Sequence, residues 1–429
     1  MPLMGAANKA PRGSARPLAP TPPMGWNSWN SFATTITEAQ AIETAQIMAA
    51  KLLPAGYDIF TIDIQWYEPG ATSYQYSADP QPVLDGFGRL LPAPNRFPSS
   101  AGGKGFAPLA QRVHRLGLRF GVHLMRGIPR GAVEANLPIL GTRHRARDIA
   151  DRTSTCSWNP DMFGVDMRAP GAQAYYDSVF ALLAAWGVDF VKMDDMSRPY
   201  DAHSLEIEAA HAAIAKTGRP ILLSLSPGET PVIRADHVRR YAQMWRISDD
   251  FWDEWSMLEQ QFVRLENWSG HAGPDSWPDA DMLPLGRLAL GARDTRLTAD
   301  EQRTLMTLWS IARSPLIMGG DLRHLDDATL ALLTNPEVVA VNQRSSSNRP
   351  HYLRDDVRIW SARADDGGHY IALFNTSGQA RSITLDAAQL GFGRVTRARD
   401  LWARRDLAMS PMGIERRIAS HGADLLRLW

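Results

Sequence analysis

The segment VDFVKMDD (188–195) ends in three charged residues after a mostly apolar run. Its apolar residues are typical of a strand that is buried on both faces. Side chains alternate along a strand, so Lys192 and Asp194 lie on one face and Met193 lies on the other. If the first face points inward, an ammonium group and a carboxylate meet at the end of a buried strand.

Two further apolar segments carry charged residues in the same way. Asp63 falls within the segment 57–66, and Arg246 shares a face with Asp250 in the segment 244–250. Convergent carboxylates and cations are suited to cleaving a glycosidic bond, because one ionised carboxylate attacks the anomeric carbon while a protonated one donates to the departing oxygen. A charge at a strand end is also often the first solvated residue of a loop. Its repetition on three segments favours the catalytic interpretation.

These charged residues need a scaffold that brings several strand ends together. Short apolar segments alternate with stretches that carry helix signals, such as Thr37 followed by Gln40 and Thr298 followed by Glu301. This alternation implies parallel strands with right-handed crossovers, and predicts an α/β fold, a (β/α)8 TIM barrel whose active site lies at the carboxyl ends of the strands. The predicted strands are 24–29, 57–66, 118–125, 188–195, 221–228, 244–250, 278–283 and 314–322.

The pattern changes after residue 340. Short, partly alternating segments separated by turn signals replace the helical stretches, at 357–363, 369–376 and 394–403. They predict a small antiparallel β-sandwich. The expected organisation is a flexible N-terminal tail (1–20), a catalytic (β/α)8 barrel (21–340) and a C-terminal β-sandwich domain (341–429).

Composition excludes several classes of protein. The chain has 46 basic and 46 acidic residues, so nothing indicates a nucleic-acid or membrane partner, and no apolar run reaches the length of a membrane span. Cys156 is the single cysteine, which excludes an intrachain disulfide and paired-cysteine metal sites. We expect no metal and no cofactor. The first residues lack the apolar region of a signal peptide, which leaves open a cytoplasmic protein or an exported one whose leader was removed. The oligomeric state is also open.

Six motifs in order resemble glycoside hydrolase family 27, the α-galactosidase and α-N-acetylgalactosaminidase family. The resemblance covers residues 21 to 345 and implies a carbohydrate-cleaving barrel that acts on oligosaccharides or polysaccharides. The motifs are TPPMGWNSWNSF (21–32), VKMD (191–194), WRISDDFWDEW (245–255), PDADML (278–283), ARSPLIMGGDL (312–322) and NPEVVAVNQ (335–343).

Carried over position by position, the resemblance makes Asp194 the nucleophile and Asp250 the general acid/base of an exo-acting, retaining α-glycosidase, with α-galactosides as the favoured substrates. Retention implies a covalent glycosyl-enzyme and two carboxyl groups roughly 5–5.5 Å apart. The resemblance also implies substrate contacts. Lys192 and Arg246 would bind sugar hydroxyls, Trp26 would form an apolar wall, Asp63 would accept hydroxyl hydrogen bonds, and Asp281 and Met282 would line the far side.

The chain departs from the family around the sugar. Ile64 stands where galactose-binding members have a second aspartate, and Met125 stands where another aspartate is common. Ser226 replaces a glutamate, as in the N-acetylgalactosaminidase branch. Asp249 replaces a small residue beside Asp250, so the choice between these two aspartates rests on spacing from Trp245-Arg246. The glycon is therefore open between galactose, N-acetylgalactosamine, β-L-arabinopyranose and the glucose of an isomaltodextranase-like enzyme.

Two residues keep two interpretations each. His123, at a strand end, either contacts the ligand or packs in the core. Trp158, in the loop after the third predicted strand, either stacks on a sugar or packs the loop. For the whole chain, the alternative is a carbohydrate-binding barrel without catalysis. The presence of a complete charged set argues against it, namely Lys192, Asp194, Arg246 and Asp250.

Overall fold

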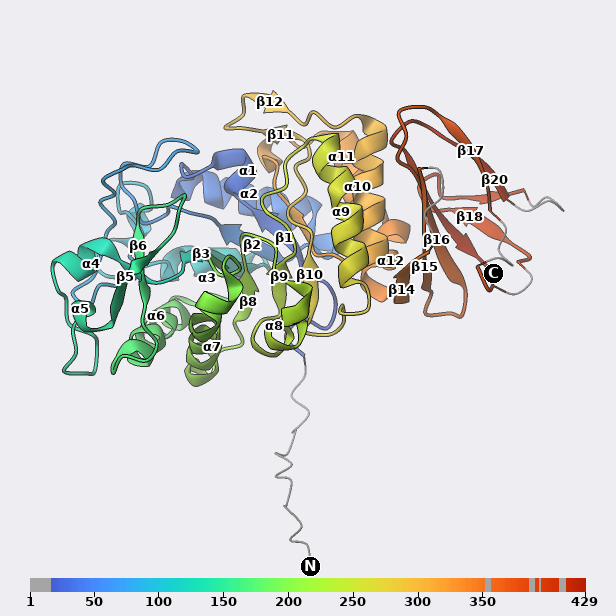
Figure 1. Cartoon of the computed structure of the whole chain (residues 1–429). Helices are drawn as coiled ribbons and strands as arrows, with labels where there is room; N and C mark the ends of the chain where they lie inside the picture. Colours follow the sequence, from blue (N-terminus) through green and yellow to red (C-terminus); the bar gives the residue numbers. More distant parts are fainter. Residues whose placement is uncertain (1–16, 352–355, 386–389, 393–394, 409–413) are drawn as a thin grey trace, which may run out of the picture.

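A computed structural model describes residues 17–351, 356–385, 390–392, 395–408 and 414–429. Residues 1–16 of the predicted tail and residue 394 of the third predicted sandwich segment lie outside this part. The described chain forms a barrel of strands and helices followed by antiparallel sheets toward the carboxyl end (Figure 1). Within the described residues, no helix combines the length and apolar character needed to cross a membrane.

Eight parallel strands form one curled sheet in the order β10-β9-β8-β7-β3-β2-β1-β13. A parallel bridge between Leu283 and Met318 links the two ends of this order. The sheet therefore curls into the predicted barrel. Its strands are β1 (Met24–Asn27), β2 (Ile59–Ile62), β3 (Arg119–Met125), β7 (Phe190–Asp194), β8 (Leu222–Leu225), β9 (Met244–Arg246), β10 (Trp277–Asp279) and β13 (Leu316–Met318).

Helices cover the outside of the barrel, and two of them begin where the sequence signals predict. Thr37 and Thr298 both form capping boxes, and Gly187 ends its helix in the left-handed conformation. The helices are α1 (Trp29–Phe32), α2 (Glu38–Lys51), α3 (Ala107–Arg115), α4 (Arg130–Glu134), α5 (Ala146–Ile149), α6 (Ala172–Trp186), α7 (Tyr200–Thr217), α8 (Ala235–Tyr241), α9 (Trp255–Trp268), α10 (Ala299–Ala312), α11 (Asp327–Thr334) and α12 (Pro336–Arg344). Short 3-10 helices span Leu53–Ala55, Pro98–Ser100, Val232–Arg234 and Leu322–His324.

Inward-facing residues change from apolar to polar along the strands. On β7 the sequence of this face is Phe190, Lys192, Asp194. Strand register sets Lys192 beside His123 on one side and Ser224 on the other, so the polar residues form common layers. A small apolar cluster fills part of the interior and is made of Ala19, Ile59, Phe190, Leu222, Met244, Trp277, Met282 and Ile317. The polar side chains are therefore collected at the carboxyl ends of the strands.

The C-terminal part is a β-sandwich, as predicted. A six-stranded sheet (β14-β15-β16-β21-β18-β19) and a two-stranded sheet (β17-β20) enclose an apolar core that includes Ile371, Ile383 and Leu426. The sandwich packs on the barrel through α10, where Thr304 donates a hydrogen bond to the carbonyl of His421 (2.6 Å). The strands are β14 (Ser346–Pro350), β15 (Val357–Arg363), β16 (His369–Asn375), β17 (Arg381–Leu385), β18 (Ala398–Asp400), β19 (Arg405–Leu407), β20 (Ile414–Ile418) and β21 (Ala423–Leu428).

Several elements differ from the sequence-based expectation. The predicted strands 278–283 and 314–322 contract to three residues each, because the remaining residues turn into the loops at the barrel mouth. Helix α12 continues across the predicted boundary at 340 and ends at Arg344. Two small sheets went unpredicted, an excursion after β3 formed by β4 (Ile128–Pro129), β5 (Ala150–Thr155) and β6 (Met162–Val165), and the hairpin of β11 (Arg287–Leu288) and β12 (Arg293–Asp294).

Candidate active site

A cavity of ≈ 460 Å³ opens at the carboxyl ends of the barrel strands. The loops after β1, β2, β7, β8 and β9 and the excursion after β3 supply its walls, as expected for the functional end of such a barrel. Its size suits a small ligand. It is lined by Trp29, Asp63, Ile64, Tyr76, Ser157, Trp158, Lys192, Asp194, Asp195, Arg198, Pro227, Gly228, Asp249, Asp250 and Trp252.

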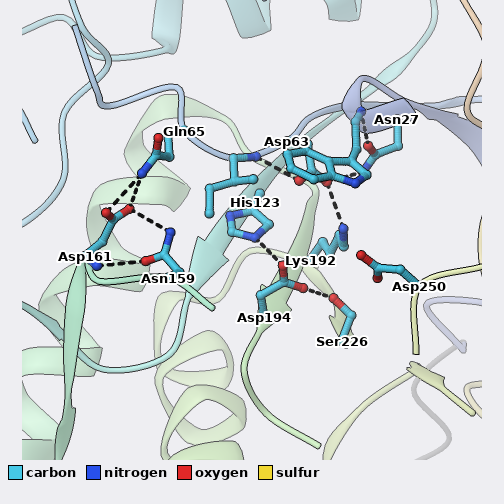
Figure 2. Close-up of polar contacts among 12 residues, drawn as sticks. Asn27, Asp63, Gln65, His123, Asn159, Asp161, Lys192, Asp194, Ser226 and Asp250 are labelled. Carbon is cyan, nitrogen blue, oxygen red and sulfur yellow. Dashed lines mark hydrogen bonds and ion pairs between the residues drawn. The ribbon is translucent and has the colours of Figure 1, made fainter. Parts of the chain in front are cut away.

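Asp194 is held from both sides by hydrogen bonds (Figure 2). His123 Nε2 lies 2.7 Å from one carboxylate oxygen, and the Ser226 hydroxyl donates to the other. Burial alone would raise the pKa of Asp194, but the charge of Lys192 and the His123 and Ser226 contacts hold that pKa well below its usual range. The carboxylate is therefore ionised and fixed in orientation, which are the two properties a nucleophile needs.

Lys192 forms an ion pair with Asp63 and lies close enough to Asp194 for the two charges to affect each other. Its ammonium group lies 3.0 Å from Asp63, which also accepts a hydrogen bond from the Asn27 amide (2.7 Å). Burial lowers the pKa of Lys192, but the surrounding carboxylates, Asp194 and Asp63 foremost, raise it above its ordinary value. Lys192 therefore stays charged inside the barrel.

Asp250 lies on the other side of Lys192. Figure 2 shows its carboxylate directed toward Lys192 and Asp194. Its side chain is 50% exposed, and its closest basic partner is Arg246 at 3.4 Å. Asp194 and Asp250 line the same cavity, but Asp194 is enclosed by donors while Asp250 keeps a face open to solvent.

Arg246 and its partners form a layer beneath the open cavity. The guanidinium lies 2.8 Å from Asp281, and the backbone of Phe251 donates to the same carboxylate (2.7 Å). Burial raises the pKa of Asp281 to about 6 and that of Asp279 to about 7, with Arg246 opposing both shifts. Met282 adjoins these residues in a closed internal cavity of ≈ 20 Å³.

A buried ion pair network supports the loop that follows Asp194. Arg126 lies 2.7 Å from both Asp195 and Glu206, and its backbone N–H donates to the carbonyl of Asp194 (2.9 Å). Asp195 adopts a left-handed conformation with φ 62°. The network ties the end of β7 to α7. The sequence carried no sign of it beyond the unusual pair Asp194-Asp195.

Aromatic side chains form one wall of the cavity, but Trp26 is not among them. Trp26 has no exposed surface, donates to the Gly320 carbonyl (2.8 Å) and stacks on Phe60, because its strand position points away from the barrel interior. The expectation that Trp26 contacts sugar is therefore corrected. Trp29 lines the cavity and stacks on Tyr76 at 6.3 Å between ring centroids.

The remaining predicted site residues divide into two groups. Asp63, Ile64, Trp158, Lys192, Asp194 and Asp250 line the open cavity. His123, Ser226, Arg246, Asp281 and Met282 are buried next to it and are not among its lining residues, so their predicted contacts with substrate stay predictions. His123 and Ser226 both bond to Asp194, which gives His123 a polar contact that neither of its two interpretations included.

Sequence reasoning missed several lining residues, among them Trp29, Tyr76, Arg198 and Trp252. Trp29 follows Trp26 in the same motif and only its position on the loop side of β1 separates the two. Trp252 lies within the motif at 245–255, although that motif did not mark it as a lining residue, and Tyr76 and Arg198 lie in loops with no periodic pattern.

Comparison with known proteins agrees with this geometry. The family profile described as alpha galactosidase A matches residues 134–344, and that of the alpha galactosidase C-terminal beta sandwich domain matches residues 354–428. An alpha-galactosidase of Coffea arabica is 30% identical over 91% of this chain and 88% of its own, and human alpha-galactosidase A is 30% identical over 88% and 79%.

Among solved structures, a β-L-arabinopyranosidase of glycoside hydrolase family 27 from Geobacillus stearothermophilus is 48% identical, with a TM-score of 0.94 over 96% of this chain and 97% of that one. A variant of that enzyme has been solved in complex with arabinose. With both domains matched by family profiles and relatives that span most of the chain, the protein described here belongs to glycoside hydrolase family 27 and is a glycoside hydrolase.

Proposed function

We propose that the chain hydrolyses β-L-arabinopyranosides from the non-reducing end, with retention of anomeric configuration. Ile64 carries this proposal, because it lines the cavity next to Asp63 and Lys192. β-L-Arabinopyranose has the ring stereochemistry of α-D-galactose but lacks the hydroxymethyl group at C5. An isoleucine offers that group no hydrogen bond and would leave its hydroxyl unpaired, whereas a pentose presents a plain CH₂.

α-Galactosides are the second candidate. The Asp63–Lys192 pair can bond ring hydroxyls that both sugars share, and the alpha-galactosidases described above are relatives over most of the chain. N-Acetylgalactosamine is less well supported. Ser226, which resembled that branch of the family, is buried and donates its hydroxyl to Asp194 instead of facing the open cavity.

The proposed chemistry is a double displacement. An Asp194 oxygen attacks the anomeric carbon while the bond to the leaving oxygen breaks, and Asp250 gives its proton to that oxygen. Asp250 then removes a proton from water, and the water oxygen attacks the anomeric carbon and releases Asp194. The depressed pKa of Asp194 and the presence of Asp250 in the same cavity support these roles.

The first test is a panel of aryl glycosides comprising the β-L-arabinopyranoside, α-galactoside, α-N-acetylgalactosaminide and α-glucoside. We expect the highest kcat/KM with the β-L-arabinopyranoside and slower turnover of the α-galactoside. A higher kcat/KM for either of the other two sugars would refute the assignment of the glycon. No turnover of any member would favour the non-catalytic alternative.

The second test separates the two carboxyl groups. Asp194→Asn should abolish turnover of every substrate. Asp250→Asn should lower kcat/KM by about 10²–10⁴ on substrates with poor leaving groups and much less on activated ones. Azide should then restore turnover of the Asp250→Asn enzyme and yield a glycosyl azide of retained configuration. Asp249→Asn is the matched control, and azide rescue in that variant would show that the acid/base is Asp249 instead.

A further inference from the structure

The rim of the cavity carries an exposed ion pair that joins two loops. Arg198, on the loop after β7, lies 2.7 Å from Asp249, on the loop after β9. The two side chains are 61% and 60% exposed, and both line the cavity. An exposed pair of this kind contributes little to fold stability. Because the pair lines the cavity next to Asp250, we consider a role in ligand binding.

The loop between them leaves space for these two side chains. Gly228 has φ +98°, and a side chain there would start 3.3 Å from Arg198 Cβ and 3.8 Å from the Asp249 carboxylate. Gly228 and Pro227 both line the cavity. The rim thus presents guanidinium donors and carboxylate acceptors close together, next to a glycine that adds no side chain.

An aromatic surface completes this part of the cavity. Trp158 is 37% exposed, and its ring centroid lies 5.7 Å from that of Tyr76, which also lines the cavity. Trp252 lines the cavity two residues after Asp250. A sugar ring offers an apolar face of C–H groups and an edge of hydroxyls, which match an indole face and a charged hydrogen-bonding pair.

The exposure of the lining side chains indicates which part of the cavity would hold the leaving-group sugar. Asp63, Ile64, Lys192 and Asp194 surround the proposed glycon, and Asp250 is placed to protonate the leaving oxygen. The side chains of Arg198 and Asp249 are 61% and 60% exposed, against 50% for Asp250, so they are the more solvent-exposed part of this region. We propose that Arg198, Asp249 and Trp158 bind the sugar residue on the leaving-group side of the scissile bond. This inference rests on the proposed glycosidase function and deepens it, since it makes the natural substrate an oligosaccharide.

The charge of the cavity favours a neutral sugar in this position. Five carboxylates line the cavity (Asp63, Asp194, Asp195, Asp249 and Asp250) against two basic side chains (Lys192 and Arg198). A uronic acid would meet this excess of negative charge and would have to compete with Asp249 for Arg198. A neutral hexose or pentose can accept from Arg198 and donate to Asp249 at once.

The test compares two substrates that share one glycon. The first is β-L-arabinopyranosyl fluoride, whose leaving group is a single atom and leaves the rim empty. The second is a disaccharide in which the same glycon is linked to galactose. The quantity measured is the ratio of kcat/KM for the disaccharide to kcat/KM for the fluoride. Turnover of the fluoride also shows that each variant is folded. If the α-galactoside proves the better glycon, the galactosyl pair of substrates replaces these two.

We expect Arg198→Ala and Trp158→Ala each to lower this ratio by about tenfold or more, the loss expected for a contact to a charged group or a stacking surface. Arg234→Ala is the matched control, because Arg234 forms an exposed pair with Asp201 (2.6 Å) away from the cavity lining. An unchanged ratio in both rim variants would overturn the inference while leaving the glycosidase intact. No turnover of either substrate by the parent would overturn both, and faster turnover of a disaccharide with a uronic acid would overturn the neutral class.

Discussion

Replacing His123 tests what keeps Asp194, the proposed nucleophile, ionised. His123 is fully buried, its Nε2 lies 2.7 Å from Asp194, and its Nδ1 has no hydrogen-bond partner among the described residues. Among the described residues, the single polar contact of its side chain is therefore to Asp194, the proposed nucleophile. His123→Phe removes that contact with little change in volume, while Lys192 and Ser226 remain beside the carboxylate.

The size of the effect follows from the hydrogen bond. A bond to a charged group contributes about 1.5–3 kcal/mol, and one pKa unit corresponds to 1.36 kcal/mol, so the acid limb of the activity should move upward by about one to two pH units. The sign follows from the chemistry. The folded pKa of Asp194 is depressed, activity requires the ionised form, and losing a donor makes protonation easier. The stability that this carboxylate contributes is present above its unfolded pKa and lost as pH falls, and it shrinks in the variant.

The assay is kcat/KM against pH for the aryl glycoside that the enzyme turns over fastest, which reports groups of the free enzyme. Each sample is returned to neutral pH afterwards to confirm that activity recovers. His211→Phe is the control, since His211 contacts the Tyr241 carbonyl on the outer helices and not the site. An acid limb that stays at the parent's position, or moves to lower pH, would refute the role assigned to His123.

Three other changes have defined outcomes. Ile64→Asp should raise the kcat/KM of the α-galactoside relative to the β-L-arabinopyranoside by about tenfold or more, because a carboxylate can accept from the extra hydroxyl, whereas Ile64→Val should not. Arg126→Met should lower the free energy of unfolding in denaturant by about 3–5 kcal/mol, since it strands two buried carboxylates, while the exposed Arg198→Met should cost about 0–1 kcal/mol. Asp279 has a pKa raised to about 7, so its contribution to stability is lost as pH rises toward that value; Asp279→Asn should therefore reduce the fall in melting temperature between pH 5 and pH 8.

The barrel and its charged end were accessible from sequence because both depend on local periodicity. Side-chain alternation alone placed Lys192 and Asp194 on one face, and both line the cavity. The capping boxes at Thr37 and Thr298 marked two helix starts that the structure confirms. Each of these inferences needed only neighbouring residues and the geometry of one element.

The rest of the site depends on loops that cross between elements. Trp26 and Trp29 differ in role because a strand ends between them, which composition cannot reveal. Tyr76 reaches the cavity from an irregular loop, and Arg126, just after β3, finds its partners just after the neighbouring strand β7 and on α7. Such residues come together only in the folded chain, and local sequence patterns do not show which distant residues will be neighbours.

The two carboxyl groups of the proposed mechanism have different roles, and the fold gives them different surroundings. Asp194 is the last residue of β7, where strand register brings Lys192, His123 and Ser226 around it. Asp250 lies beyond the end of β9, where the chain has left the barrel, so its side chain remains half exposed. Shifting Asp194 by one residue along β7 would turn its side chain to the other face of the strand. The position of this aspartate within its motif is thus a physical requirement of the proposed mechanism, whereas Asp249, the neighbour of Asp250, pairs with Arg198 at the rim.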